Sequence, residues 1–218
     1  MQALPLFPLG TVLVPGLVLP LNVFEPRYRR LVADLLEGPE ERRVFGVVAI
    51  KEGHEVGEHG ARALYPVGCT AVVRKVTENA DGGYELVTSG AVRFRLHGLD
   101  DDAGTPYLTG LVSSLDEPDG DGADVTGLAR RVGLRFAAYR ETLGAEQTGL
   151  PSSPRVLSYL VTAGMVLDLA DRQSLLEQPD TVSRLRAALY LLGRERVLLS
   201  ELRAIPSPRS LGLRSSLN

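Results

Sequence analysis

The chain has 218 residues, of which 44% are hydrophobic and 23% are charged, and its formal net charge at pH 7 is −3. These values are typical of a globular protein, and no apolar run reaches the roughly 18 residues that a membrane-spanning helix needs. The single cysteine excludes an intrachain disulfide, and no Lys or Arg precedes the first apolar residues as in a secretory signal. We therefore expect a cytoplasmic protein that does not enter a membrane.

The charge divides the chain into two parts. Residues 1–122 carry 11 basic and 18 acidic side chains, whereas residues 123–218 carry 13 arginines and 9 acidic side chains. All basic residues except Lys51 and Lys75 are arginines. A general bias in amino-acid composition explains this excess of arginine better than a binding surface does. The change in the sign of the charge indicates a domain boundary.

The segment from Leu4 to Phe24 is apolar but is interrupted by prolines at positions 5, 8, 15 and 20. Because proline has no backbone N–H and a fixed φ, it interrupts long helices and is usually confined to edge strands. The segment is therefore predicted to form short strands separated by bends, without a central strand. The gaps that the prolines leave in strand pairing also predict irregular sheet edges near the N-terminus.

A helix is predicted directly after this segment. Glu25 suits its N-cap or first turn, Pro26 suits its first position, and Gly38 suits its end. Between them, apolar residues recur at three- and four-residue spacing: Tyr28, Leu31, Val32, Leu35 and Leu36.

Residues 44–115 are predicted to be rich in strands. Val44–Ile50 has the continuous apolar run of a buried central strand, and residues 51–63 are predicted to be a mobile loop. Further strands are expected at residues 69–77, 84–88, 92–97 and 107–115, with an Asp-Gly hairpin turn at Asn79–Gly83. Val92–His97 alternates apolar and polar residues, which is typical of a half-buried strand with His97 on the surface.

A flexible acidic linker is predicted at Asp116–Asp124, and the apolar period beyond it is helical. Ser153 and Pro154 are expected to begin a helix that runs to Leu169, and a short helix is expected at Asp171–Glu177. Asp180 is expected to cap the last helix. The domains would be a β-domain at residues 1–118, a helical subdomain at 119–204, and a disordered tail at 205–218.

Three segments resemble the N-terminal, substrate-binding domain of Lon proteases. They are the opening from Leu4 to Leu36 with its Phe24-Glu-Pro-Arg-Tyr28 motif, the strand pair of Gly68–Leu99 with its Gly90-Ala-Val-Arg-Phe94 strand, and Asp171–Glu177 before Arg184–Leu189. The resemblance implies an α+β chain: a PUA-like antiparallel pseudo-barrel with one early helix, followed by a C-terminal helical bundle. It also implies a stand-alone member of the family, without the ATPase and protease domains.

No catalytic activity or cofactor is predicted. A P-loop needs a Gly-x-x-x-x-Gly-Lys-Ser/Thr sequence, and neither lysine lies in one. The Ser-Lys dyad of Lon proteases would belong to a domain beyond residue 218. A protease label would therefore come from the relatives alone.

Four residues at the start of the early helix are the candidate binding site: Phe24, Glu25, Arg27 and Tyr28. In the functional interpretation, Arg27 and Tyr28 beside irregular strands anchor a peptide. In the structural interpretation, which we favour, Glu25 caps the helix, Tyr28 faces the core, and Arg27 pairs with a nearby acid.

Other reactive residues have simpler explanations. Cys69 is expected to be a small buried hydrophobe, and His54 and His59 lie in a Gly/Glu-rich stretch without the spacing of a zinc motif. Asp119, Asp121 and Asp124 lack the bidentate glutamate of a calcium loop, so we expect no metal site.

The leading hypothesis is a module that binds exposed apolar segments of unfolded polypeptides, alone or together with a protease, as an adaptor or regulator of protein quality control. The alternative is RNA binding by the PUA-like fold, and a weaker third is a small-molecule or hydrolytic role. RNA affinity should fall steeply with salt, whereas apolar peptide binding should not.

Overall fold

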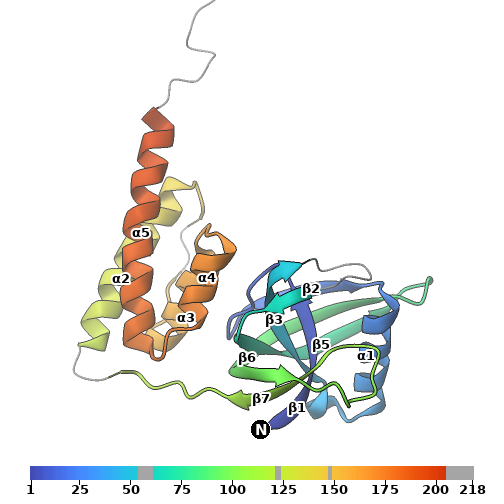
Figure 1. Cartoon of the computed structure of the whole chain (residues 1–218). Coiled ribbons are helices and arrows are strands. Elements are labelled where there is room, and N and C mark those ends of the chain that lie inside the picture. Colours follow the sequence, from blue (N-terminus) through green and yellow to red (C-terminus); the bar gives the residue numbers. More distant parts are fainter. Residues whose placement is uncertain (54–60, 121–123, 147–148, 205–218) are drawn as a thin grey trace, which may run out of the picture.

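The computed structural model describes residues 1–53, 61–120, 124–146 and 149–204. A sheet with one helix comes first, and four helices follow (Figure 1). The elements are β1 (Gln2–Leu9), β2 (Val18–Val23), α1 (Pro26–Glu37), the 3-10 helix η1 (Glu40–Arg42), β3 (Val44–Gly53), β4 (Ala61–Leu64), β5 (Val67–Glu78), β6 (Tyr84–Leu99), β7 (Thr109–Ser114), α2 (Val125–Thr142), α3 (Pro154–Gly164), α4 (Leu169–Leu176) and α5 (Thr181–Ala204).

The strands form a sheet in which one ring of pairings is closed. The order is β1-β7-β6-β5-β3-β4. Because β1 also pairs β3, the strands β1, β7, β6, β5 and β3 form a closed ring. All described pairs are antiparallel, as the resemblance implies, except the β1–β3 pair, which is parallel. β2 lies off this ring and pairs β6.

The prediction that the proline-rich opening contains no central strand is wrong. β1 has a neighbour at each end: Gln2–Pro5 pair with β7, and Leu6–Leu9 pair with β3. The strand changes partner between Pro5 and Leu6, so each proline lies in a half that has one partner strand in the described sheet. Each half therefore forms a ladder of hydrogen bonds on one side, and there is no ladder on the other side for the missing N–H of a proline to interrupt.

The early helix is confirmed at its predicted ends. α1 has Glu25 at its N-cap position, Pro26 in its first turn and Gly38 at its C-cap. Its buried residues Tyr28, Leu31 and Val32 pack on the inside of the sheet, in a cluster that includes Phe7 and Phe45. The helix therefore fixes the position of the segment that joins it to β2.

The strand boundaries differ from the prediction in two places. β3 continues to Gly53 and β4 begins at Ala61, where a loop was expected, and the rest of that loop (residues 54–60) lies outside the described residues. The two strands expected between Tyr84 and His97 are one strand of 16 residues. The hairpin turn before it is confirmed, because the Asn79 N–H donates to the Gly83 carbonyl at 2.8 Å and Gly82 has a φ of +76°.

The alternation predicted for Val92–His97 is wrong at its start. Val92 is 47% exposed and Arg93 is only 1% exposed, although His97 is exposed as expected. The cause is an irregularity in the β5–β6 pairing, where Cys69 faces Arg93 but Ala71 faces Gly90. The extra residue on β6 turns the following side chains to the opposite face.

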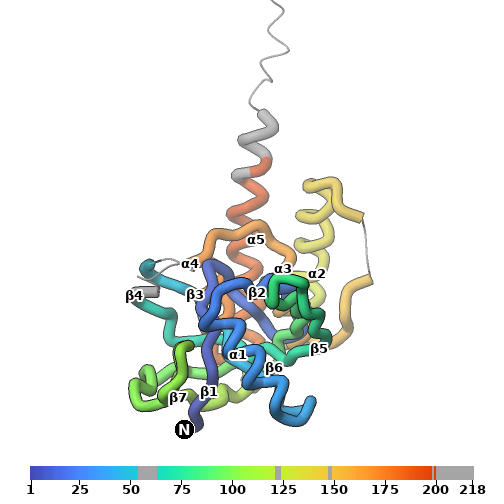
Figure 2. The backbone as a smooth tube through the Cα atoms, turned by 90° about the vertical axis from the view of Figure 1, so that its right-hand side faces the viewer, coloured from blue at the N-terminus to red at the C-terminus, as the bar shows by residue number. Residues whose placement is uncertain are grey.

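The four helices α2 to α5 share a second core that includes Phe136, Leu157, Met165 and Leu185. The predicted caps are confirmed: Ser153 accepts a hydrogen bond from the Val156 N–H, and Asp180 accepts one from the Ser183 N–H at 2.7 Å. α3 ends at Gly164, earlier than expected. α3 and α4 lie on the side that faces the sheet, and α5 projects beyond the strands (Figures 1 and 2).

The described part of the predicted flexible linker is held in place, which corrects that prediction. Glu117 accepts hydrogen bonds from Arg93 and from the Tyr159 hydroxyl. The carbonyls of Pro118 and Asp119 accept from the N–H groups that begin α5, each at 3.0 Å. Residues 121–123 and the predicted tail, residues 205–218, lie outside the described residues.

Candidate functional site

Three of the four predicted site residues lie around one hollow. Phe24, Glu25 and Tyr28 line a hollow of about 170 Å³ where β1, β2 and the start of α1 meet. Its other lining residues are Phe7, Leu9 and Pro20–Val23. Arg27 is not part of the lining.

The contacts within this group agree with the structural interpretation for two residues. The Tyr28 ring is buried and stacks on Phe7 with 4.0 Å between ring centroids. The Arg27 guanidinium pairs with the Glu25 carboxylate at 3.0 Å and lies 4.6 Å from the Tyr28 ring centroid. Glu25 occupies the N-cap position, but its side chain bonds to Arg27 and makes no capping hydrogen bond.

Phe24 differs from its neighbours because the residue is 56% exposed. It lies directly after β2, whose residues 18, 20 and 22 are exposed and alternate with residues that are partly buried. β2 pairs β6 on one side and has no strand partner on its other edge within the described sheet. An exposed aromatic ring therefore lies beside an open strand edge, near the prolines that predicted irregular edges.

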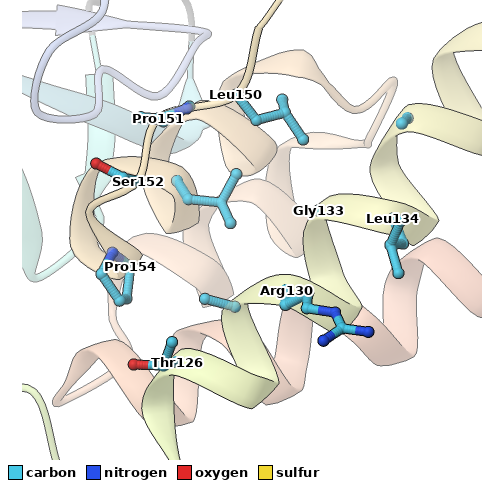
Figure 3. A pocket seen from close by; sticks show the side chains of 11 residues that line it. Thr126, Arg130, Gly133, Leu134, Leu150, Pro151, Ser152 and Pro154 are labelled. Atoms are coloured by element: carbon cyan, nitrogen blue, oxygen red, sulfur yellow. The ribbon is translucent and has the colours of Figure 1, made fainter.

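A second and larger hollow lies in the helical half, and the sequence reasoning missed it. One face of α2 and the segment Leu150–Leu157 enclose about 360 Å³ (Figure 3). This helical groove is lined by Thr126, Ala129, Arg130, Gly133, Leu134, Ala137, Leu150, Pro151, Ser152, Pro154 and Leu157. The signal that was overlooked is the spacing of small residues at 129, 133 and 137 on one helix face.

The other candidates have structural roles. Cys69 is fully buried, and burial raises the pKa of its thiol to about 12, so the nucleophilic thiolate does not form near neutral pH. Asp124 caps α2 by accepting from the Gly127 N–H at 2.8 Å, and Asp119 pairs with Arg155 at 3.6 Å. His54, His59 and Asp121 lie outside the described residues.

Within the described ranges there is no cluster of three or more His, Cys, Asp or Glu side chains that could hold a metal ion. Among the same residues, no helix is both long and apolar enough to cross a membrane.

The chain matches the family model of the ATP-dependent protease La (LON) substrate-binding domain over residues 3–194. It is 31% identical to Lon protease 2 of Myxococcus xanthus over 206 residues, which cover 91% of this chain and 24% of that protein. It is 32% identical to Lon protease 2 of Sorangium cellulosum over 223 residues, which cover 94% of this chain and 26% of that protein. The chain thus spans about a quarter of the length of these relatives.

Two solved structures have a similar fold. The Lon N-terminal domain protein from Xanthomonas campestris has a TM-score of 0.64 and 26% sequence identity, and the match covers 87% of this chain and 98% of that one. The N-terminal domain of Mycobacterium avium complex Lon protease has a TM-score of 0.65 at 17% identity and covers 88% and 98% of the two chains.

Proposed function

Because the chain belongs to the family of the ATP-dependent protease La (LON) substrate-binding domain, we propose that it is a non-enzymatic module that binds exposed apolar segments of other polypeptides. Its role would be that of an adaptor or regulator in protein quality control, acting alone or with a protease. In this proposal the closed ring of strands is a PUA-like pseudo-barrel at residues 1–118, and α2 to α5 are a helical bundle at residues 119–204.

One observation carries the location of the proposed site: the open edge of β2 next to the exposed ring of Phe24. An extended peptide that adds to a strand edge gains backbone hydrogen bonds, and pockets beside the edge select its side chains. In the proposed complex the peptide lies along β2 and places an apolar side chain in the hollow lined by Phe24, Glu25 and Tyr28.

The contacts of Arg27 and Tyr28 assign them a supporting role in this site. Tyr28 holds the start of α1 on the core through its stack on Phe7, and Arg27 holds the Glu25 carboxylate. Phe24 is then the residue that contacts the ligand, because it is exposed to solvent.

Fluorescence anisotropy tests the proposal. The probe is a fluorescein-labelled, uncharged 12-residue peptide of alternating Val and Thr, and we expect Phe24→Ser to weaken its binding at least fivefold. The matched control is Tyr190→Ser, because Tyr190 is also an exposed aromatic residue and lines neither hollow. A second probe with alternate N-methylated amides should bind poorly, since it cannot pair with a strand edge.

Equal binding of the methylated and unmethylated peptides, or of the Phe24→Ser and unchanged proteins, would contradict the proposed site. A labelled 15-nucleotide single-stranded RNA serves as the competing probe. If RNA bound with an affinity that fell steeply between 50 and 300 mM salt while neither peptide bound, the RNA-binding alternative would replace this proposal.

A further inference from the structure

At the floor of the helical groove, a residue without a side chain lets two leucines pack close to α2. Gly133 lies on the buried face of α2, and a Cβ built there would lie 3.2 Å from the Leu150 side chain and 3.8 Å from that of Leu157. In Figure 3 the helix with Arg130, Gly133 and Leu134 lies opposite the segment Leu150–Pro154. The space of about 360 Å³ between them is within the range of small ligand pockets.

The only charge in the lining of this apolar groove is positive. Arg130 is the one ionisable residue in its lining, and Arg131 and Arg135 are exposed nearby on the same helix. No ion pair to any of the three occurs within the described ranges. α2 as a whole contains four arginines and a single acidic residue, Glu141. A ligand for the groove should therefore combine apolar surface with negative charge.

We infer that the helical groove binds a polypeptide segment in which apolar side chains alternate with Asp or Glu. This inference rests on the proposed polypeptide-binding function and adds a second contact region with its own preference. An apolar side chain of the segment occupies the hollow between α2 and the segment Leu150–Pro154, and a neighbouring carboxylate pairs with Arg130. Such pairing of a carboxylate with a guanidinium is a charge-assisted hydrogen bond.

The charge of the groove argues against the chain's own C-terminal segment as the occupant. Residues 205–218 contain Arg209 and Arg214 and no acidic residue, so their charge has the same sign as that of Arg130. An acidic partner carries the opposite charge, so the arginines of α2 that have no ion pair within the described residues favour its approach.

The test compares two neighbouring arginines on one helix. The probe is a fluorescein-labelled 12-residue peptide of alternating Leu and Glu, and we expect Arg130→Glu to weaken its binding at least tenfold. Arg131→Glu is the matched control, because it changes the net charge equally, is also exposed, and lies outside the lining; we expect less than a threefold effect. Leu134→Ser at the groove rim should weaken binding at least fivefold, and Leu143→Ser, outside the groove, should not.

Several outcomes would overturn the inference. Equal losses for Arg130→Glu and Arg131→Glu would indicate non-specific attraction, and equal binding of a Leu/Lys peptide would remove the charge preference. Displacement of the peptide by a 15-nucleotide RNA would assign the surface to nucleic acid. Self-association that Arg130→Glu abolishes, measured by sedimentation, would assign it to a second copy of the chain.

The same titrations separate this inference from the proposed function. If the uncharged Val/Thr peptide binds in a manner that depends on Phe24 and the Leu/Glu peptide does not bind, only the groove inference fails. If the Leu/Glu peptide binds through Arg130 and the Val/Thr peptide does not bind, the site at β2 fails and polypeptide binding stands.

Discussion

Glu117 connects the two halves of the molecule through a small polar network. Its carboxylate accepts hydrogen bonds from the Arg93 guanidinium and from the Tyr159 hydroxyl, the latter at 2.6 Å, and lies 3.6 Å from Arg184. Burial raises the pKa of Tyr159, which keeps the phenol protonated as a donor. Both arginine side chains are almost completely buried, so one carboxylate balances two guanidiniums that have little access to water.

The remaining positive charge faces backbone carbonyls at the end of α4. Arg93 donates to the carbonyls of Leu176 and Gln178 at 2.7 and 2.6 Å, and Arg184 donates to that of Leu175 at 3.2 Å. The last carbonyls of a helix have no partner within the helix and carry partial negative charge. The end of α4 is therefore the acceptor that makes two buried arginines tolerable beside a single glutamate.

We predict that Glu117→Gln destabilises the protein by about 3 kcal/mol, because loss of one partner of a buried ion pair leaves its charges uncompensated. Glutamine keeps the size of the side chain and one acceptor oxygen, so the effect reports the charge. The free energy of unfolding from urea titration measures it. The control is Asp119→Asn, which removes the exposed pair with Arg155 and should cost less than about 1 kcal/mol. Equal effects of the two substitutions would contradict the assigned role of Glu117.

At the scale of elements, β6 determines much of the β-half because it pairs β5, β7 and β2. The irregularity near Gly90 allows β6 to pair with all three neighbours and turns the Arg93 side chain toward the interior. Gly90 also exchanges backbone hydrogen bonds with the segment before β2: its N–H donates to the Leu17 carbonyl, and its carbonyl accepts from Gly16, both at 2.9 Å. A Cβ on Gly90 would overlap the Val14 carbonyl.

Gly90→Ala should therefore destabilise the protein by about 2 kcal/mol, the cost of forcing an extra methyl group into a packed site. Thermal unfolding followed by circular dichroism measures the loss. Gly98→Ala provides the comparison, since Gly98 is on the same strand and a Cβ there would meet no atom within 4 Å. If both variants unfolded at the same temperature, the close approach of Val14 would not limit position 90.

At the scale of the whole molecule, the two halves share a hydrophobic cluster as well as the Glu117 network. Val12, Val14 and Val67 from the β-half pack with Tyr159 and Leu176 from the helical half. In addition, the Gln173 side-chain amide on α4 donates to the Val67 carbonyl at 2.9 Å. The two proposed binding regions, the edge of β2 and the helical groove, therefore lie on halves that pack against each other.

We predict that the protein unfolds in a single calorimetric transition and that Arg93→Leu separates it into two. Without the guanidinium, Glu117 loses its partner on β6 and the carbonyls of Leu176 and Gln178 lose a donor, so the halves become less strongly coupled. Arg95→Leu is the control, since Arg95 is an exposed arginine on the same strand. Two transitions in the unchanged protein, or a single transition in Arg93→Leu, would show that the network does not couple the halves.

Features that depend on adjacent residues could be predicted from the sequence. The ends of α1, the Asn79–Gly83 turn and the caps at Ser153 and Asp180 are each specified by a few neighbouring side chains. The gathering of Phe24, Glu25 and Tyr28 around one hollow is likewise local, because these residues lie close together in the sequence.

Features that join distant segments could not be predicted in this way. β1 has strand neighbours at both ends because it changes partner between two remote strands. Arg93 is buried because Glu117 and the end of α4 contact it. The groove exists because Leu150 lies opposite Gly133. A periodic pattern shows which residues of one element share a face, but the partner of that face is chosen elsewhere in the chain. The helix and strand boundaries are thus largely local properties, whereas the junction and the groove arise from packing between segments far apart in sequence.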